Sequence, residues 1–250
     1  MQIVVNRLLT RYELTGKGRL VLLLHGWGDS SDGLSNLRKS LAKHYQVLVP
    51  DLPGFGNTQP PEEVWDLDNY GQFIKDLLVK LEIQQPYAII GHSNGGAVAI
   101  RAISLGLLKP EKLILLAASG IRKSWSAKRF ILQAIAKTGD IATIWLPERY
   151  RRALRRSLYA AAGSDMLVVP QLQETFKKTV RQDIRTDAAT ISVPSLLIYA
   201  ANDRAVPLAN GRKYHQLIKD SRLEVITDAG HFVHLDQADK VEALIEEFLK

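Results

Sequence analysis

Residues 87–100 read Tyr87-Ala88-Ile89-Ile90-Gly91-His92-Ser93-Asn94-Gly95-Gly96-Ala97-Val98-Ala99-Ile100. The apolar run 87–90 predicts a buried strand of a parallel sheet, and the small residues from Ala97 onward predict a helix that packs closely against it. Between them, Gly91-x-Ser93-x-Gly95 places a serine in a sharp strand-to-helix turn, with its hydroxyl above the edge of the sheet. The free N–H groups of that helix point toward any negative charge that develops beside Ser93. The stretch therefore predicts a nucleophilic serine, and a tight turn without chemistry is the alternative.

Strand and helix signals alternate on both sides of this stretch. Alternation of this kind demands right-handed crossovers, so it predicts a doubly wound α/β fold with a mostly parallel sheet. Two or three strands are predicted within residues 3–24, and further strands at 46–49, 112–117, 193–200 and 223–227. Helices are predicted at 34–44, 68–81, from 97 onward, 208–218 and 238–249.

The strand pattern stops at Ile121 for about 70 residues, and helical signals replace it. We therefore predict an α/β core made of residues 1–120 and 188–250, interrupted by a helical lid at 121–187. Within the lid, three apolar residues recur at every fourth position and arginines surround them, so one helix face can dock while the others are cationic. The apolar positions are Tyr150, Leu154 and Leu158, and the arginines are Arg149, Arg151, Arg152, Arg155 and Arg156.

The composition of the 250 residues, 46% hydrophobic and 24% charged, is ordinary for a soluble globular protein. No apolar run approaches the roughly 18 to 20 residues that a membrane span requires. The first residues lack a secretion signal, and the absence of cysteine leaves neither a disulfide framework nor a thiolate metal site. We expect a cytoplasmic protein that needs no metal or organic cofactor.

The net charge of +7 is concentrated in the predicted lid. Residues 121–187 contain 14 Lys and Arg against 6 Asp and Glu, whereas the rest of the chain has 19 against 20. A solvated helical face explains such a balance, because basic surfaces are common. A surface that attracts anions is the other interpretation.

A serine hydroxyl is a poor nucleophile at neutral pH, so it needs a histidine base that a carboxylate holds in place. The loops that follow parallel strands gather at one edge of the sheet, and the partners of Ser93 are expected there. Asp203 lies three residues beyond the strand that ends at Ala200, and His231 lies four residues beyond the strand that ends at Thr227. The chain order Ser93, Asp203, His231 is the order expected of this topology.

Other residues compete less well for these roles. His234 is the rival base, and Asp51 follows a strand that is distant in the expected order. His25 and His92 flank functional loops, where a packing or orienting role is expected, and His44 and His215 fall in predicted helices. An oxyanion hole needs two donors aimed at one point, and we expect these from the backbone N–H groups of Asn94 and Trp27. Trp27 as a mere pocket-lining aromatic is the alternative.

Together these motifs resemble the α/β-hydrolase superfamily over nearly the whole chain. The resemblance rests on His25-Gly26-Trp27-Gly28, Asp51-Leu52-Pro53-Gly54-Phe55-Gly56, Gly91-His92-Ser93-Asn94-Gly95-Gly96, Asn202-Asp203-Arg204-Ala205-Val206-Pro207 and Gly230-His231. It is similar to the lidded branch that holds carboxylesterases, carbon-carbon bond hydrolases, proline iminopeptidases and the pimeloyl carrier-protein methyl esterase. Serine at position 93 argues against the haloalkane dehalogenases, which use aspartate. Two positions depart from the pattern: Asn94 replaces a frequent Met or Leu, and Ala200 a frequent glycine.

The resemblance implies a serine hydrolase that cleaves a small carboxylic ester through an acyl-enzyme. Carbon-carbon hydrolase, thioesterase or aminopeptidase activity would use the same residues. A non-catalytic ligand-binding receptor on the same fold is the hypothesis of another class. By resemblance, the lid roofs the site. If its cationic surface is more than a solvated helical face, its charge suits an anionic small substrate or an acidic carrier protein, and the carrier protein is what the resemblance to the pimeloyl esterase implies. A nucleic acid or an anionic lipid surface ranks lower.

A first prediction concerns the lid arginines. Replacing Arg151, Arg152, Arg155 and Arg156 by glutamine should raise the Michaelis constant for an anionic ester and hardly affect a neutral ester of the same size, because the patch concentrates anions locally. The difference should shrink as added salt shortens the Debye length to about 8 Å near physiological ionic strength. Steady-state kinetics on the two esters check this, and equal effects on both would assign the arginines to ordinary surface.

Overall fold

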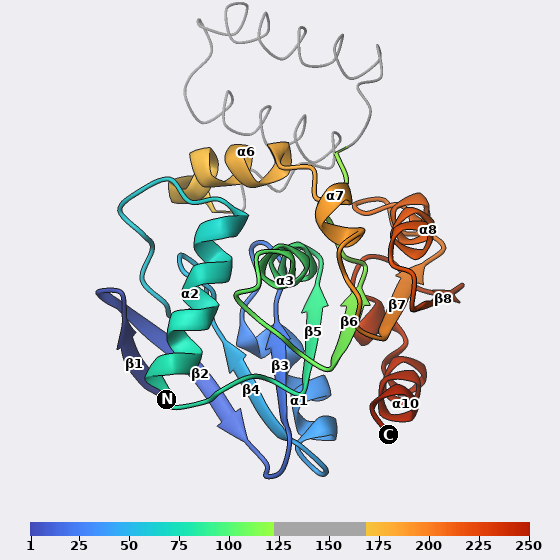
Figure 1. The fold of residues 1–250 in the computed structure, drawn as a ribbon, viewed down its shortest axis with the longest axis horizontal. Helices are drawn as coiled ribbons and strands as arrows, with labels where there is room; N and C mark the ends of the chain where they lie inside the picture. Colours follow the sequence, from blue (N-terminus) through green and yellow to red (C-terminus); the bar gives the residue numbers. More distant parts are fainter. Residues whose placement is uncertain (123–168) are drawn as a thin grey trace, which may run out of the picture.

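A computed structural model describes residues 1–122 and 169–250 of the chain, which form a twisted sheet with helices on both faces (Figure 1). In the described residues, eight strands pair in the order β1-β2-β4-β3-β5-β6-β7-β8. The strands are β1 (Gln2–Val5), β2 (Leu8–Thr15), β3 (Leu20–Leu24), β4 (Gln46–Pro50), β5 (Ala88–His92), β6 (Lys112–Leu116), β7 (Ser195–Ala200) and β8 (Ser221–Ile226). The pairs β1–β2 and β2–β4 are antiparallel, and every later pair is parallel.

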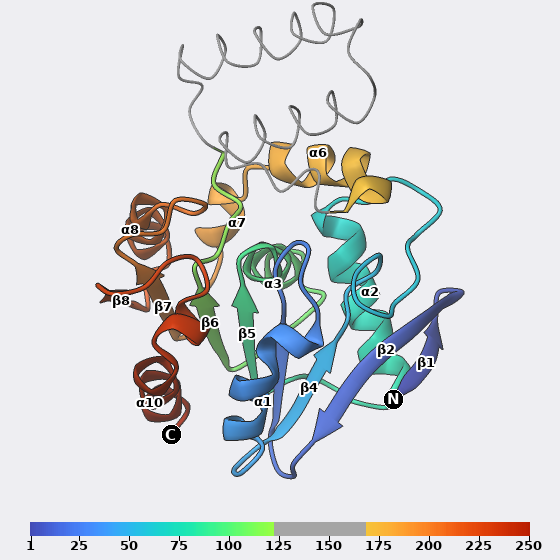
Figure 2. The same cartoon turned by 180° about the vertical axis from the view of Figure 1, so that it is seen from behind.

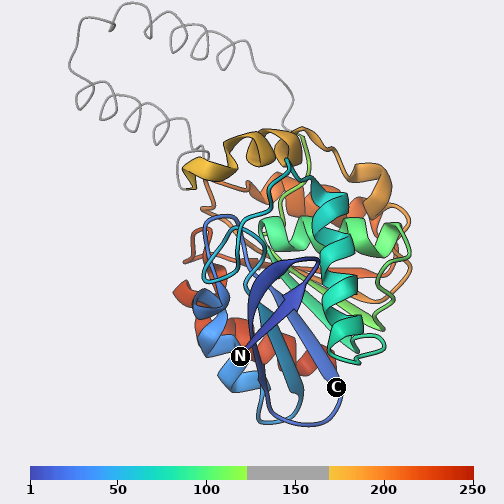
Figure 3. The ribbon, with the colours of Figure 1, turned by 90° about the vertical axis from the view of Figure 1, so that its left-hand side faces the viewer.

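The helices form two layers, one on each face of the sheet (Figure 3). Helices α2 (Leu67–Lys80), α3 (Asn94–Ser104) and α8 (Leu208–Leu217) contribute to one apolar core, and α1 (Ser35–Leu41) and α10 (Ala238–Leu249) to the other. Figure 2 shows α1 and α10 on the same side of the sheet. Shorter elements are η1 (Ser31–Leu34), η3 (Pro170–Leu172), α6 (Gln173–Arg181), α7 (Arg185–Ala188) and α9 (Val233–Asp236). The predicted doubly wound α/β fold is confirmed.

The central strand β3 is apolar throughout because helices cover both of its faces. Leu22 and Leu24 point into the core under α2 and α3, whereas Val21 and Leu23 point into the core under α1 and α10. All four side chains are buried. A strand covered on both faces needs apolar residues at every position rather than at alternate ones.

Most predicted elements occur where the sequence places them, and the errors lie at their ends. The predicted helix 34–44 stops at Leu41, so His44 lies in a turn rather than in a helix. The helix predicted from Ala97 begins three residues earlier, at Asn94. Asp66 caps α2 by accepting the N–H groups of Asp68 and Asn69, which starts that helix at Leu67. The helix predicted at 238–249 matches α10 at both ends.

The described part of the predicted lid lies at the edge where the parallel strands end. Helices α6 and α7 pass over this edge, on the side toward which β5 and β6 point (Figure 1). The lid residues from 123 to 168 lie outside the described residues. These include the docking positions Tyr150, Leu154 and Leu158 and the arginines at 149, 151, 152, 155 and 156. The boundaries of the lid therefore stay a prediction.

No helix within residues 1–122 and 169–250 has the length and apolar character of a membrane span. The cytoplasmic location stays a prediction.

An ion-pair network ties α7 to the core. Arg101, on the helix that follows Ser93, contacts Asp187 of α7 through Nη1 at 2.6 Å and Asp68 of α2 through Nε at 2.7 Å. The hydrogen bond from Arg101 holds the pKa of the Asp68 carboxyl below its usual range. Gln182 adds a hydrogen bond from its amide Nε2 to the same carboxylate at 3.2 Å. This arrangement links the three helices α2, α3 and α7.

We predict that Asp187→Asn lowers the free energy of unfolding by about 1 to 3 kcal/mol, because the half-buried guanidinium of Arg101 loses the charged acceptor that the buried Asp187 provides. Urea unfolding followed by circular dichroism measures this. Asp183→Asn is the matched control, because it removes the carboxylate of the exposed Arg185–Asp183 pair in the same segment and should cost at most about 1 kcal/mol. Equal losses in the two variants would contradict a structural role for Asp187.

Candidate active site

Ser93 occupies a strained turn between β5 and α3. Its backbone angles are φ 50° and ψ −115°, in a region that residues with a side chain rarely adopt. Hydrogen bonds to neighbouring segments hold this conformation: the Ser93 N–H donates to the Leu116 carbonyl at 3.0 Å, and the Ser119 N–H donates to the Ser93 carbonyl at 3.0 Å. The end of β6 therefore supports the turn that presents the hydroxyl.

The glycines around Ser93 are required by close packing. A Cβ atom on Gly91 would lie 2.5 Å from the Cα of Gly96, and one on Gly95 would lie 2.3 Å from the Leu24 carbonyl oxygen. Neither Gly91 nor Gly95 has a positive φ, so Ser93 itself carries the strained backbone. The glycines allow α3 to begin directly against β5 and the end of β3, at separations that no side chain permits.

The structure brings Ser93, His231 and Asp203 together as a hydrogen-bonded chain. The Ser93 Oγ lies 3.0 Å from His231 Nε2, and His231 Nδ1 lies 2.8 Å from Asp203 Oδ2. An ionised carboxylate only accepts hydrogen bonds, so the imidazole proton sits on Nδ1 and the Nε2 lone pair faces the Ser93 hydroxyl. The three residues come from loops after β5, β7 and β8, as predicted.

The carboxylate of Asp203 is fully buried and held by its own loop. Its Oδ1 accepts the backbone N–H groups of Ala205 and Val206, both at 2.8 Å. These bonds leave Oδ2 for His231. The loop after β7 thus orients the acid through its own backbone, independently of His231.

Two further histidines orient the loops of the site. His25 is completely buried, donates from Nδ1 to the Gly26 carbonyl at 2.8 Å and accepts the Leu52 N–H on Nε2 at 2.9 Å. His92 donates from Nε2 to the backbone carbonyl of His231 at 3.1 Å. The predicted orienting role of His25 and His92 agrees with these contacts: one joins the loops after β3 and β4, and the other positions the loop of His231.

His234 and Asp51, the alternatives to His231 and Asp203, do not contact Ser93 or His231 through hydrogen bonds in the described residues. His234 is buried with its ring centroid 4.7 Å from that of His92, and it makes no hydrogen bond to Ser93. Asp51 is also buried, and its two oxygens accept the N–H groups of Ser31 at 2.7 Å and Asn57 at 2.9 Å. Asp51 therefore organises the loops on the β4 side of the site, a role that sequence reasoning missed.

The residues predicted to supply the oxyanion donors, Trp27 and Asn94, belong to two segments that meet at Ser93, and the oxyanion hole itself stays a prediction. A Cβ atom on Gly26 would lie only 3.2 Å from the Cβ of Ser93, so the loop after β3 passes beside the nucleophile. Asn94 is the first residue of α3, where a helix leaves its N–H groups unpaired. Within the described ranges, no hydrogen bond uses the backbone N–H of Trp27 or Asn94.

Aromatic side chains surround the indole of Trp27. Its ring centroid lies 4.9 Å from that of Phe55 and 5.0 Å from that of Phe176, which belongs to α6. Sequence reasoning placed Phe55 in a loop motif without assigning it a contact. It gave no signal for Phe176, because the contact joins residues separated by most of the chain.

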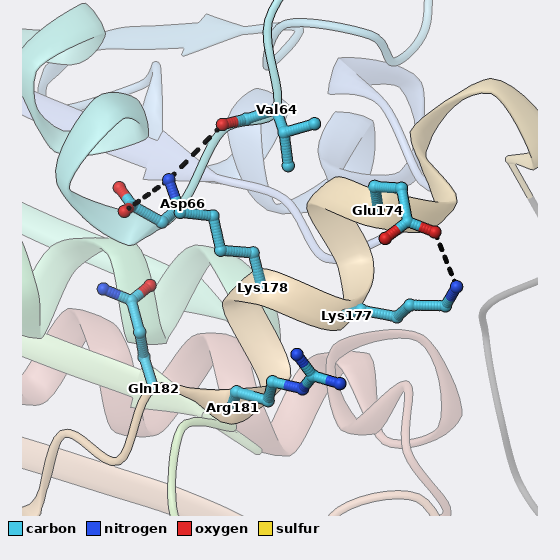
Figure 4. Close-up of a pocket in the computed structure, with 7 residues that line it drawn as sticks. All are labelled: Val64, Asp66, Glu174, Lys177, Lys178, Arg181 and Gln182. Carbon is cyan, nitrogen blue, oxygen red and sulfur yellow. Dashed lines mark hydrogen bonds and ion pairs between the residues drawn. The ribbon is translucent and has the colours of Figure 1, made fainter.

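A surface groove in the described parts of the chain lies away from Ser93. It has a volume of about 430 Å³ and runs between α6 and the loop before α2 (Figure 4). Its lining residues are Val64, Asp66, Glu174, Lys177, Lys178, Arg181 and Gln182. Lys178 pairs with Asp66 at 3.0 Å, and Lys177 pairs with Glu174 at 2.6 Å. None of the residues gathered around Ser93 lines this groove. Across residues 1–122 and 169–250, no cluster of three histidine or acidic side chains suits a metal ion.

A comparison with known protein families identifies the family of this chain. Residues 21–244 match the model of the alpha/beta hydrolase family. The chain belongs to the alpha/beta hydrolase family. This assignment confirms the resemblance that the sequence motifs indicated.

Individual relatives are distant but match along nearly their whole length. The chain is 26% identical over 253 residues to a 2-hydroxy-6-oxo-2,4-heptadienoate hydrolase of Pseudomonas putida, a match covering 94% of this chain and 90% of the relative. It is 25% identical over 248 residues to a 2-hydroxy-6-oxo-6-(2'-aminophenyl)hexa-2,4-dienoic acid hydrolase of Metapseudomonas resinovorans, covering 92% and 83%. A thermophilic esterase from Thermogutta terrifontis shares the fold, with a TM-score of 0.76, 23% identity and coverage of 100% and 97%.

The buried histidines generate a prediction for acid stability. Burial lowers the pKa of His25, His92 and His234, His92 most of all, so the folded state keeps these rings neutral. As pH falls below the ordinary histidine value of 6.5, the unfolded chain binds protons that the folded chain does not, and the free energy of unfolding falls.

Urea unfolding between pH 7.5 and 5 should show this loss of stability. In His234→Asn, the free energy of unfolding should change less steeply with pH, by up to about 1.4 kcal/mol per pH unit. An unchanged slope in His234→Asn would mean that this ring does not stay neutral in the folded state.

Proposed function

We propose that this protein is a serine hydrolase that cleaves small carboxylic esters through an acyl-enzyme. The observation that carries the proposal is the hydrogen-bonded chain Asp203–His231–Ser93. A base within hydrogen-bond reach of the nucleophile, itself oriented by a buried carboxylate, is the arrangement that activates a serine hydroxyl.

The reaction begins when Ser93 Oγ attacks the ester carbonyl carbon while its proton moves to His231 Nε2. The buried carboxylate of Asp203 stabilises the imidazolium that forms. The negative charge on the carbonyl oxygen is received by the N–H groups of Trp27 and Asn94, at the positive end of α3.

The tetrahedral intermediate collapses when His231 returns the proton to the departing alcohol oxygen, which leaves the acyl group on Ser93. A water molecule then gives a proton to His231 and attacks the acyl carbon. The second collapse releases the carboxylic acid, and the proton returns to Ser93. No step requires a group outside the protein, the substrate and water.

Carbon-carbon bond hydrolysis is a second candidate. Its support comes from the two relatives named as hydrolases of 2-hydroxy-6-oxo dienoic acids, which match more than nine-tenths of this chain. The same three residues would serve a ketone substrate, with a carbon atom in place of the alcohol oxygen as the leaving group. A panel that includes both a simple ester and such a dienoic acid separates the two reactions.

A ligand-binding role without catalysis fits the site less well. A receptor has no need of a serine in a strained backbone conformation with an oriented histidine 3.0 Å from its hydroxyl. We further propose that residues 121–187 act as a lid that controls access to the site, and that the partner is a small-molecule ester.

We predict that a fluorophosphonate probe labels the protein at Ser93 and that Ser93→Ala abolishes the labelling. On short p-nitrophenyl esters, Ser93→Ala and His231→Ala should lower kcat roughly 10⁶-fold, and Asp203→Ala about 10⁴-fold, because the three residues act as a unit. His234→Ala is the control for loss of a neighbouring buried histidine and should keep most of the activity. Folded protein that neither reacts with the probe nor turns over an ester would refute the proposal.

A further inference from the structure

The chain segment at the end of β6 holds the backbone of Ser93 at both its N–H and its carbonyl group. The Ser93 N–H donates to the Leu116 carbonyl, and the Ser119 N–H donates to the Ser93 carbonyl, both at 3.0 Å. Between these two contacts, Ala117 has a φ of 46°, in the left-handed region that residues with a side chain rarely adopt. The strained turn of Ser93 is therefore held by a second strained turn, and that turn needs support of its own.

Two tyrosine hydroxyls support this second turn, which we call the β6 loop (residues 117–120). The hydroxyl of Tyr199, on β7, donates to the Ala118 carbonyl at 2.9 Å. The hydroxyl of Tyr214, on α8, donates to the Ser119 carbonyl. Two neighbouring carbonyl groups of the β6 loop are thus held by side chains from two different elements.

Both tyrosine rings are themselves fixed by close packing. Each ring is fully buried, at 0% exposure. A Cβ atom on Gly211 of α8 would lie 2.6 Å from the ring of Tyr199, so the backbone of this helix packs directly on that ring. A Cβ atom on Gly120 would lie 3.0 Å from the hydroxyl oxygen of Tyr214. The two hydroxyls therefore have little freedom to follow a displaced loop.

A buried tyrosine hydroxyl needs some acceptor, so one such bond by itself indicates only a satisfied polar group. The arrangement here is more specific, because both hydroxyls donate to the loop whose next contact is the nucleophile. Ser119 accepts from Tyr214 on its carbonyl and donates from its N–H to Ser93. The path from each hydroxyl to the backbone of Ser93 is therefore short and consists of hydrogen bonds and covalent bonds.

We infer that Tyr199 and Tyr214 are positioning residues for the nucleophile, and that they act on Ser93 through the β6 loop. This inference rests on the proposed ester hydrolysis and assigns two further residues to it. The Ser93 Oγ lies 3.0 Å from His231 Nε2, a separation that depends on where the backbone of Ser93 is held. A small displacement of a nucleophile lowers the rate of attack more than it lowers substrate binding.

The test removes one hydroxyl at a time. Tyr199→Phe and Tyr214→Phe keep the buried ring and lose only the bond to the β6 loop. Stopped-flow kinetics with p-nitrophenyl acetate separate the acylation rate constant of Ser93 from the dissociation constant of the ester, and titration with a fluorophosphonate gives the concentration of active sites. In each variant the acylation rate constant should fall about 3- to 20-fold, with the dissociation constant changed by less than about twofold.

Tyr70→Phe is the matched control. Tyr70 is also fully buried, and its hydroxyl donates to the Pro53 carbonyl at 3.2 Å, in the loop after β4. Among the residues that the structure describes, no hydrogen bond joins Pro53 to Ser93. Tyr70→Phe should lower the free energy of unfolding about as much as the other two variants, because it loses the same kind of bond, and it should keep the wild-type acylation rate constant.

Hydrogen exchange of the Ser119 amide, followed by NMR, measures the β6 loop without turnover. Exchange of this amide should become faster in Tyr199→Phe and Tyr214→Phe and stay unchanged in Tyr70→Phe, because only the first two variants loosen the loop. Either single variant decides the outcome if the other fails to fold.

The outcomes separate this inference from the proposed function. Wild-type acylation in both Tyr199→Phe and Tyr214→Phe, or an equal loss in Tyr70→Phe, would overturn the inference, while fluorophosphonate labelling of Ser93 would still support ester hydrolysis. Absence of labelling in the wild-type protein, together with no turnover of any ester, would instead refute the proposed function itself.

Discussion

The strained backbone of Ser93 is the constraint on which the site depends. A residue with a side chain is held at φ 50° only because the surrounding structure outweighs the cost of that conformation, which is of order 1 to 3 kcal/mol. The end of β6 supplies hydrogen bonds on both sides of the turn, and α3 packs into β3 and β5 without intervening side chains. In this conformation the Ser93 hydroxyl makes no capping hydrogen bond to α3 and faces His231 instead.

Each side chain of the site is oriented by hydrogen bonds to a neighbouring group. Asp203 is oriented by two backbone N–H groups, His231 by Asp203 on its side chain and by His92 on its carbonyl, and Ser93 by the sheet. Each group is fixed by a neighbour that is itself fixed. Little rearrangement is then needed as charge develops on the imidazole and on the substrate oxygen, which is the physical basis of electrostatic preorganisation.

The loops around Ser93 also contact the segment that follows residue 168. Trp27 follows Gly26, whose backbone passes beside Ser93. The contact of Trp27 with Phe176 links this part of the site to α6, and the ion pairs of Arg101 link α3 to α7. Helices α6 and α7 therefore contact elements that border the nucleophile, so changes in these helices reach the site through direct packing.

The sequence alone determined the fold class, the position of Ser93 and the choice of Asp203 and His231, because these follow from local signals. An apolar run bounded by glycines specifies a buried strand and a close-packed helix, and parallel strands collect the loops after them at one edge. Only the tertiary structure decided that Asp51 organises backbone N–H groups and that Trp27 packs against Phe176. These outcomes depend on side-chain directions and on contacts between segments far apart in the chain. Hydrophobic periodicity reports only on residues close together in the sequence, so it cannot predict contacts between distant segments.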